Sequence, residues 1–159
     1  MPNRALVLDA NILIRAVLGI RVRRILENFA DRVSFFVPEL ALSEAQGHLA
    51  TLVTRRGGDP ANALCLLDAM VGLVDLVGPE IYREDETEAK RRLGSRDPDD
   101  WPILASALAL GCPIWTEDTD FFGCGVATWT PNSVEIFLGD EVRSFRSSHT
   151  YPWSVDAPR

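Results

Sequence analysis

The sequence contains few of the residue types that several common kinds of site require. Cysteine occurs only as Cys65, Cys112 and Cys124, at spacings that match no metal-binding motif. An odd number of cysteines without a secretion signal favours a reducing compartment, so we expect three free thiols packed as small core residues. Histidine occurs only as His48 and His149, and neither follows a predicted strand, which argues against a zinc hydrolase built on histidine ligands.

Long apolar runs are also missing. No apolar segment reaches the ~18 residues needed to cross a bilayer. Residues 1–4 lead directly into a strand-like segment and leave no room for a targeting sequence. We therefore expect a cytoplasmic protein without membrane association. A chain of 159 residues, 47% of them hydrophobic and 25% charged, has the size and composition of one folded domain.

Lysine is nearly absent, because Lys90 is the only lysine and the other fifteen basic residues are arginine. Arginine suits bidentate contacts with phosphate groups. The formal net charge of −7 opposes non-specific binding to nucleic acid. Several carboxylates gathered around a divalent cation would, however, be largely neutralised by it. The charge therefore does not exclude a nuclease.

Hydrophobic periodicity, with glycine and proline at the breaks, predicts strands that alternate with helices. The expected strands are 4–8, 33–37, 73–77, 113–116 and 126–130. The expected helices are 12–18, 21–30, 38–56, 60–72, 79–94, 100–110 and 131–138. This order predicts an α/β fold in three layers, α/β/α, with a parallel sheet of about five strands covered on both faces. From Gly139 onward we expect an irregular tail.

Acidic residues recur next to the predicted strands, at Asp9, Glu39, Glu44, Asp97, Asp99, Asp100, Asp118 and Asp120. Ligands of open α/β sheets bind outside the carboxyl ends of the strands. Carboxylates brought together there repel one another unless a cation or a shared proton offsets their charge. Mg²⁺ and Mn²⁺ prefer oxygen ligands, and such ions assist phosphodiester hydrolysis by activating water and stabilising the leaving oxygen. The pattern therefore favours a metal-dependent hydrolase.

Four segments carry these acids in a characteristic order: LVLDANILI (6–14), VPELALSE (37–44), DPDDWPILA (97–105) and WTEDTDF (115–121). In order and spacing, the four together resemble the conserved blocks of the PIN-domain ribonucleases. The resemblance extends from about Arg4 to Thr130. The family includes the VapC-type toxins of bacterial toxin–antitoxin pairs, which are about as long as this chain.

The resemblance implies a PIN-like nuclease domain over residues 1–138, followed by the tail 139–159. It implies that four acids form the catalytic site and bind Mg²⁺ or Mn²⁺: Asp9, Glu44, Asp100 and Asp118. Asp120 would be a further metal ligand, and Asn11 and Thr116 would hydrogen-bond ligands or water. RNA would be the substrate, and a cognate antitoxin and a homodimer are implied partners. Arg15, one helical turn beyond Asn11, is a candidate for RNA contact.

Simpler interpretations exist for individual residues. Asp9 could only cap a helix, as aspartate does well. Glu39 competes with Glu44, although the helix dipole alone favours an acid at the first turn. One of the three aspartates at 97–100 is expected to be a cap, and Asp120 could cap a turn instead of binding metal. Trp101 could pack in the core or stack on a base. The arginines at 21, 23, 24, 55 and 56 are further candidates for RNA contact or for a solvated helix face.

Two other functions remain open. A PIN-like domain without activity could serve only as a binding module. An aspartyl-phosphate enzyme would also place an acid such as Asp9 after a parallel strand. It would, however, need a lysine at a later strand end, and Lys90 lies in a charged helical segment.

Overall fold

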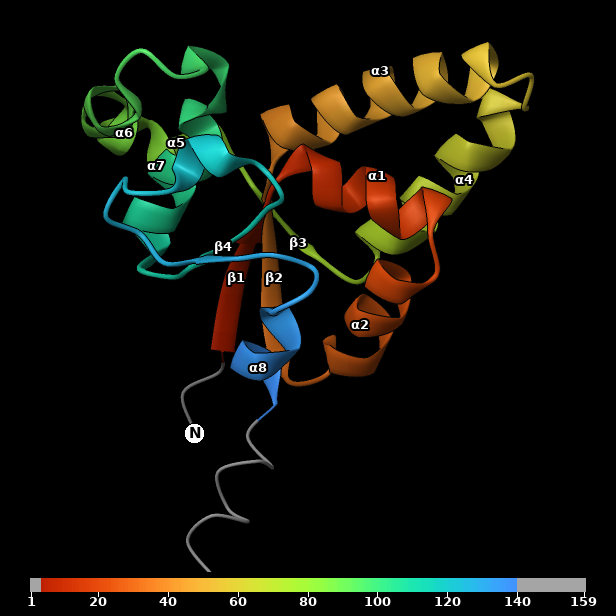
Figure 1. Cartoon of the computed structure of the whole chain (residues 1–159), viewed down its shortest axis with the longest axis horizontal. Helices are drawn as coiled ribbons and strands as arrows, with labels where there is room; N and C mark the ends of the chain where they lie inside the picture. Colours follow the sequence, from red (N-terminus) through yellow and green to blue (C-terminus); the bar gives the residue numbers. More distant parts are fainter. Residues whose placement is uncertain (1–3, 140–159) are drawn as a thin grey trace, which may run out of the picture.

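The computed structural model describes residues 4–139 and is shown in Figure 1. Eight α-helices, three 3₁₀ helices and five strands are assigned within this range. In chain order they are β1 (Arg4–Leu8), α1 (Ala10–Leu18), α2 (Arg21–Phe29), β2 (Val33–Pro38), α3 (Glu39–Arg55), α4 (Pro60–Val71), β3 (Asp75–Val77), α5 (Pro79–Tyr82), η1 (Arg83–Asp85), α6 (Glu86–Leu93), η2 (Pro98–Asp100), α7 (Trp101–Leu110), β4 (Ile114–Trp115), η3 (Thr119–Phe121), β5 (Thr128–Trp129) and α8 (Val134–Leu138).

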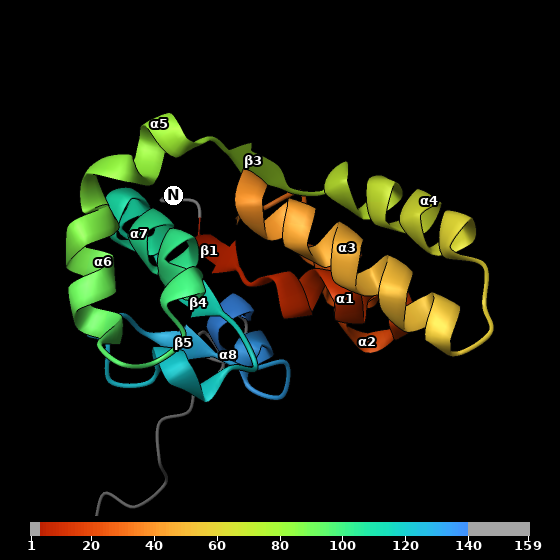
Figure 2. The ribbon, with the colours of Figure 1, turned by 90° about the horizontal axis from the view of Figure 1, so that it is seen from above.

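The five strands form one sheet in the order β3-β2-β1-β4-β5, and all neighbouring pairs are parallel. Seen from above, α5, α6 and α7 lie on one side of the sheet and α1, α2, α3 and α4 on the other (Figure 2). The expected α/β fold with about five parallel strands is therefore confirmed. Because the strands are parallel, their carboxyl ends share one edge, and each acid-bearing turn after a strand emerges there.

Burial explains why the central strands are apolar. Leu6, Val7 and Leu8 of β1 are all fully buried, because helices cover both faces of the sheet. The apolar helix α7 packs against the sheet, and its residues from Pro102 to Ala107 are all buried. Gly111 ends α7 with φ +64°, a left-handed conformation that glycine adopts without steric cost. The helix whose first turn follows Asp100 is thus rigidly embedded.

The structure differs from the expected elements at several ends. The strands β3, β4 and β5 are shorter than predicted. The helix expected over residues 79–94 is divided into α5, η1 and α6. Tyr82, at the end of α5, is buried with its ring 5.6 Å from that of Trp101. This packing joins segments distant in the sequence, so local helix patterns could not predict the division.

The prediction that all three cysteines are core residues is wrong for Cys65. Cys112 and Cys124 are buried, whereas Cys65 is exposed. On α4 the buried side chains are Leu67 and Met70. Cys65 precedes Leu67 by two positions, which in a helix places it on nearly the opposite side. All three thiols are free.

Two further expectations concern the ends of the chain and the membrane. The predicted tail 139–159, apart from Gly139, lies outside the described residues, as does His149. Within residues 4–139, none of the helices combines the length and the hydropathy that a membrane span requires.

Candidate metal centre

Neighbouring strands bring together the first and the last of the four acidic segments, which contain Asp9 and Asp118. Asp9 directly follows β1, and Asp118 follows β4 after two residues. These strands pair with each other, with Leu8 opposite Trp115, and the backbone N–H of Asp9 donates to the carbonyl of Trp115 at 3.1 Å. The turns that carry Asp9 and Asp118 are therefore adjacent, although 109 positions separate them in the sequence.

A chain of hydrogen bonds fixes these turns through a buried hydroxyl. Thr116 is fully buried, and its Oγ1 donates to Oδ2 of Asp9 at 2.8 Å. The same Oγ1 accepts from the backbone N–H of Asp118 at 2.9 Å. Oδ1 of Asp118 then accepts from the backbone N–H of Asp120 at 2.9 Å. Thr116 thus orients Asp9, and the Asp118 carboxylate shapes the turn that presents Asp120.

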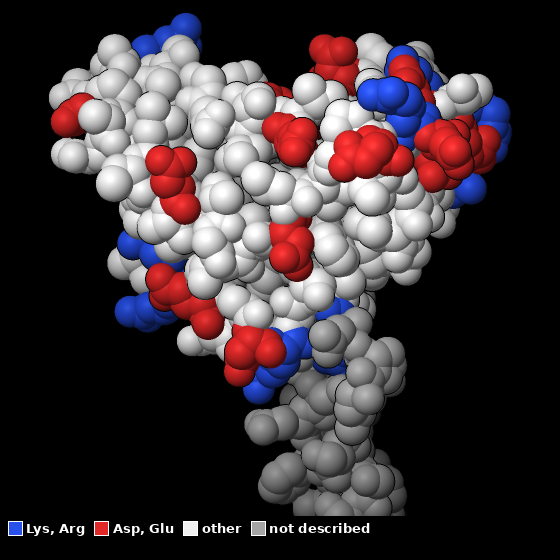
Figure 3. Space-filling model, turned by 180° about the vertical axis from the view of Figure 1, so that it is seen from behind, with Lys and Arg blue, Asp and Glu red and all other residues white. Residues whose placement is uncertain are grey.

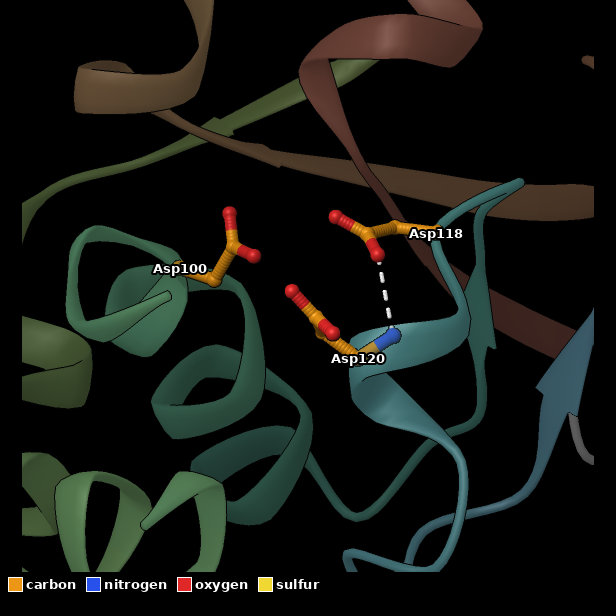
Figure 4. Close-up of side chains that lie close together, drawn as sticks. All are labelled: Asp100, Asp118 and Asp120. Atoms are coloured by element: carbon orange, nitrogen blue, oxygen red, sulfur yellow. Dashed lines mark hydrogen bonds between the residues drawn. The ribbon is translucent and has the colours of Figure 1, made fainter. Parts of the chain in front are cut away.

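Three aspartates converge on one point. Asp100, Asp118 and Asp120 each offer a carboxylate oxygen, and these three atoms lie within 4.8 Å of one another. Figure 4 shows the side chains directed toward the same gap, Asp100 from the start of α7 and the other two from the turn after β4. The N-cap of η3 is Asp118. The structure therefore does not support the alternative in which Asp120 caps this turn.

The carboxylates raise one another's proton affinity. The pKa of Asp100 is raised from 3.8 to about 7, first by burial and then by the charges of Asp9, Asp118, Asp97 and Glu44. Burial also raises the pKa of Asp9, against the lowering effect of the hydrogen bond from Thr116. Such shifts mean that the full negative charge of the cluster is unfavourable without a compensating positive charge.

The residues present fit a hard divalent cation. Oδ2 of Asp100 is buried and has no hydrogen-bond partner among the described residues. A buried carboxylate oxygen without a donor is costly, and coordination by a cation would satisfy it. All three converging ligands are carboxylate oxygens, the donor type preferred by Mg²⁺ and Mn²⁺. The geometry therefore forms a candidate metal centre.

Glu44 lies at the margin of this centre. It is on α3 with a side chain 51% exposed, and its charge raises the pKa of both Asp9 and Asp100. Glu39, the competing residue, instead raises the pKa of Tyr82. His48 lies one turn beyond Glu44, with its Nδ1 3.9 Å from Oε1 of that residue. Sequence reasoning did not pair His48 with the site, although the i,i+4 spacing could have indicated the contact.

The aspartates before α7 separate into different roles. Asp97 accepts from the backbone N–H of Asp99 at 3.0 Å and is the expected cap. Asp99 is exposed, and Asp100 is half-buried within the cluster.

Asp9 occupies the N-cap position of α1 but makes no side-chain capping hydrogen bond. Helix capping therefore does not account for the aspartate at this position.

Arg15 lies beside the acidic segment but is already paired. Its Nε is 2.5 Å from Oε2 of Glu117, the residue just before Asp118. Glu117 was missed by sequence reasoning. Asn11 is exposed in the first turn of α1. Arg23 donates to the carbonyls of Ala16 and Val17 at 2.9 and 2.8 Å, which holds its guanidinium group against the last turn of α1.

Trp101 packs in the protein. Besides the edge contact with Tyr82, its ring lies 5.2 Å below the ammonium group of Lys90. Lys90 also pairs with Glu86 at 2.5 Å. Core packing therefore accounts for Trp101, and the lysine required for an aspartyl-phosphate mechanism is engaged on α6.

Comparisons with known proteins agree with this fold. A family model described as PIN domain matches residues 7–139. No curated protein matches the chain. PAE2754 from Pyrobaculum aerophilum is 17% identical, with a TM-score of 0.65 over 86% of this chain and 90% of that chain. A chain of VapBC2 from Rickettsia felis, solved with a promoter DNA fragment, is 17% identical, with a TM-score of 0.59 over 79% and 98%. A chain of FitAcB from Neisseria gonorrhoeae is 23% identical, with a TM-score of 0.57 over 79% and 97%. At these identities the likeness concerns the fold.

Proposed function

This chain belongs to the PIN-domain family, and we propose that it is a metal-dependent endoribonuclease that hydrolyses RNA phosphodiester bonds. The observation that carries the proposal is the convergence of Asp100, Asp118 and Asp120 within 4.8 Å, with a buried, unpartnered oxygen on Asp100. We assign the metal-binding and catalytic role to Asp9, Glu44, Asp100 and Asp118, with Asp120 as a further ligand to Mg²⁺ or Mn²⁺.

Several of these residues have a defined task in the proposal. When bound, a divalent cation would activate water and stabilise the negative charge that develops on the phosphate. Thr116 holds Oδ2 of Asp9 in place, and Asp118 and Asp120 are fixed by the turn between them. Asp100 has a pKa of about 7, so it must release its proton before it can bind a cation at neutral pH.

Positive charge is sparse on one face of the described surface (Figure 3). On the face in Figure 3, Lys and Arg atoms form separate spots near the edges of the described surface, and no broad basic area is visible there. We propose that Arg15 contacts RNA phosphate beside the acids, assisted by Asn11. Because Arg15 is paired with Glu117, RNA would have to compete with that carboxylate.

We also propose that the protein is the toxin of a toxin–antitoxin pair. Support comes from the similarity in fold to chains of VapBC2 and FitAcB, whose names each denote a pair of proteins. A protein antitoxin would then cover the acidic site, and an arginine inserted among the carboxylates would offset their charge. A homodimer remains a prediction from the family resemblance, and a cytoplasmic location remains a prediction from the cysteine content and the absence of long apolar runs in the sequence.

The test is RNA cleavage by the purified full chain with Mg²⁺, Mn²⁺ or EDTA. Cleavage should require the divalent cation. Asp9→Asn should reduce the cleavage rate by roughly a hundredfold or more, because loss of a residue that only supports a metal ligand already costs about 10–100-fold. Asp99→Asn is the matched control, because Asp99 is an exposed aspartate next to the site. Cleavage that persists in EDTA, or is unchanged in Asp9→Asn, contradicts the proposal.

Calorimetric titration with Mn²⁺ tests the first alternative function, and mass spectrometry tests the second. A binding module without activity would bind no cation at the cluster and cleave no RNA. An aspartyl-phosphate enzyme would instead accumulate a covalent phosphate on Asp9, which mass spectrometry would detect after incubation with a phosphoryl donor.

A further inference from the structure

Two arginines hold the backbone of the segment that follows Asp118. Nη1 of Arg96 donates to the carbonyl oxygens of Asp120 and Phe122, both at 2.5 Å. Nη1 of Arg92 donates to the carbonyl oxygen of Cys124 at 3.1 Å. Alternate carbonyls at 120, 122 and 124 therefore bind guanidinium groups from the end of α6 and the loop after it.

Arg96 itself is joined to the other acidic segment. Its backbone N–H donates to the carbonyl of Leu93 at 3.2 Å, which ties it to the end of α6. The next residue, Asp97, caps η2, and the carbonyl of Asp97 accepts from the backbone N–H of Asp100 at 3.4 Å. Residues 96 and 97 thus connect the turn that presents Asp100 with the turn that presents Asp118 and Asp120.

We propose that Arg96 is a positioning residue that holds the Asp100 turn and the Asp118–Asp120 turn at the spacing needed for cation binding. This inference rests on the proposed metal site and adds a residue to it. The three carboxylates repel one another when no cation is bound, and this repulsion pushes the two turns apart. Two hydrogen bonds from one guanidinium nitrogen to the backbone beside Asp120 oppose that separation.

Arg96 acts on the backbone and not on the reacting groups. The side-chain acceptors of Arg96 are two carbonyl oxygens, and within residues 4–139 no carboxylate pairs with its charge. Arg91 and Arg92, in contrast, both bind Glu88. Arg96 is exposed and separated from its acceptors by 24 and 26 positions, so no local motif reveals it. Arg91 is the matched control, since it is an exposed arginine nearby whose side chain, among the described residues, hydrogen-bonds only to Glu88.

The test compares Mn²⁺ binding by the full wild-type chain with binding by Arg96→Ala, Arg96→Gln and Arg91→Ala, measured by calorimetry after removal of metal with a chelator. Arg96→Ala should weaken Mn²⁺ binding about 10–100-fold, the usual loss when a group that supports a metal ligand is removed. Arg91→Ala should bind like the wild type. In RNA cleavage, Arg96→Ala should lower kcat while the KM for RNA stays within about twofold, because Arg96 does not hold the substrate.

Thermal unfolding verifies that each variant is folded before binding is measured. If Arg96→Ala does not fold, Arg96→Gln is used to test the inference. The glutamine amide retains a donor, but its shorter side chain cannot reach both carbonyls. We therefore expect weaker Mn²⁺ binding by Arg96→Gln. A folded Arg96 variant with wild-type Mn²⁺ affinity, an equal loss in Arg91→Ala, or a raised KM with unchanged Mn²⁺ affinity would overturn the inference. Absence of Mn²⁺ binding by the wild type would overturn the proposed function as well.

Discussion

Thr116 is the residue on which the relative positions of Asp9 and Asp118 depend. Its buried hydroxyl donates to Asp9 and accepts from the backbone of Asp118, so both capacities of one oxygen atom are used. A small β-branched residue at this point also fits the end of β4. The proposed site therefore relies on a buried side chain that sets the position of two residues proposed to bind metal.

Replacing Thr116 with valine tests this role at nearly constant volume. Thr116→Val leaves Oδ2 of Asp9 and the N–H of Asp118 unpaired, which should lower the free energy of unfolding by about 1–3 kcal/mol. It should also weaken Mn²⁺ binding about 10–100-fold. Thr116→Ser, which retains the hydroxyl, is the control and should stay close to the wild type in calorimetry. Equal affinity in the valine and serine variants would show that the hydroxyl is not needed.

The assignment of individual acids also belongs to the residue scale. Asp97, Asp99 and Asp100 are near neighbours in sequence, but only Asp100 has its carboxylate in the cluster, because Asp97 is engaged as a cap and Asp99 faces solvent. Likewise Glu44, and not Glu39, has an electrostatic effect on Asp9 and Asp100. Residue type alone could not separate these candidates.

Among the elements, α7 connects the core to the metal centre. Its apolar sequence is buried from Pro102 to Ala107, and Asp100 occupies its N-cap position. At its other end, Gly111 has φ +64° and allows the chain to turn back into β4. The packing and the length of α7 therefore set the position of its first turn, and so of Asp100, relative to the sheet.

Two glycine substitutions should have opposite effects on stability. Gly111→Ala forces an L-residue into the left-handed region and should cost about 1–2 kcal/mol. Gly47→Ala lies within α3, and an added Cβ meets no atom within 4 Å. The removal of a flexible residue from a helix should there stabilise the protein by roughly 0.5–1 kcal/mol. Urea unfolding measures both changes, and the same sign in both variants would contradict the backbone explanation.

Over the whole molecule, the acidic cluster links stability to pH. The pKa of Asp100 is about 7 in the folded protein and near 3.8 when unperturbed. Between these values the folded state binds a proton that the unfolded state has released. The free energy of unfolding of the metal-free protein should therefore decrease as pH rises from about 4 to 7. The raised pKa of Asp9 acts in the same direction.

Thermal unfolding in EDTA at pH 5, 6, 7 and 8 measures this dependence. The melting temperature should fall with pH in the wild type, and Asp100→Asn should reduce the slope because its side chain does not titrate. Asp99→Asn, which removes an exposed acid, should keep the wild-type slope. Mn²⁺ should raise the melting temperature most at pH 8, where the ligands are deprotonated. A wild-type slope in Asp100→Asn would show that another group is responsible.

The sequence by itself determined the elements and the acidic character of one sheet edge. Strand patterns, proline at helix starts and glycine after α7 are local signals, since they depend on the backbone preferences of a few adjacent residues. They located Asp9 and Asp118 beside strand ends and predicted an α/β fold with parallel strands. The same patterns placed Glu44, Asp100 and Asp120 near strands among other acids. The family resemblance then selected these three, and they remain proposed site residues.

Only the tertiary structure decided which of these residues meet. The strand order β3-β2-β1-β4-β5 pairs β1 with β4, and this pairing lets Thr116 bridge Asp9 and Asp118. Packing also divided the helix at 79–94, left Cys65 exposed and directed Arg96 to the carbonyls beside Asp120. These contacts join residues from about 20 to more than 100 positions apart, and their formation depends on burial of the whole core rather than on any local preference.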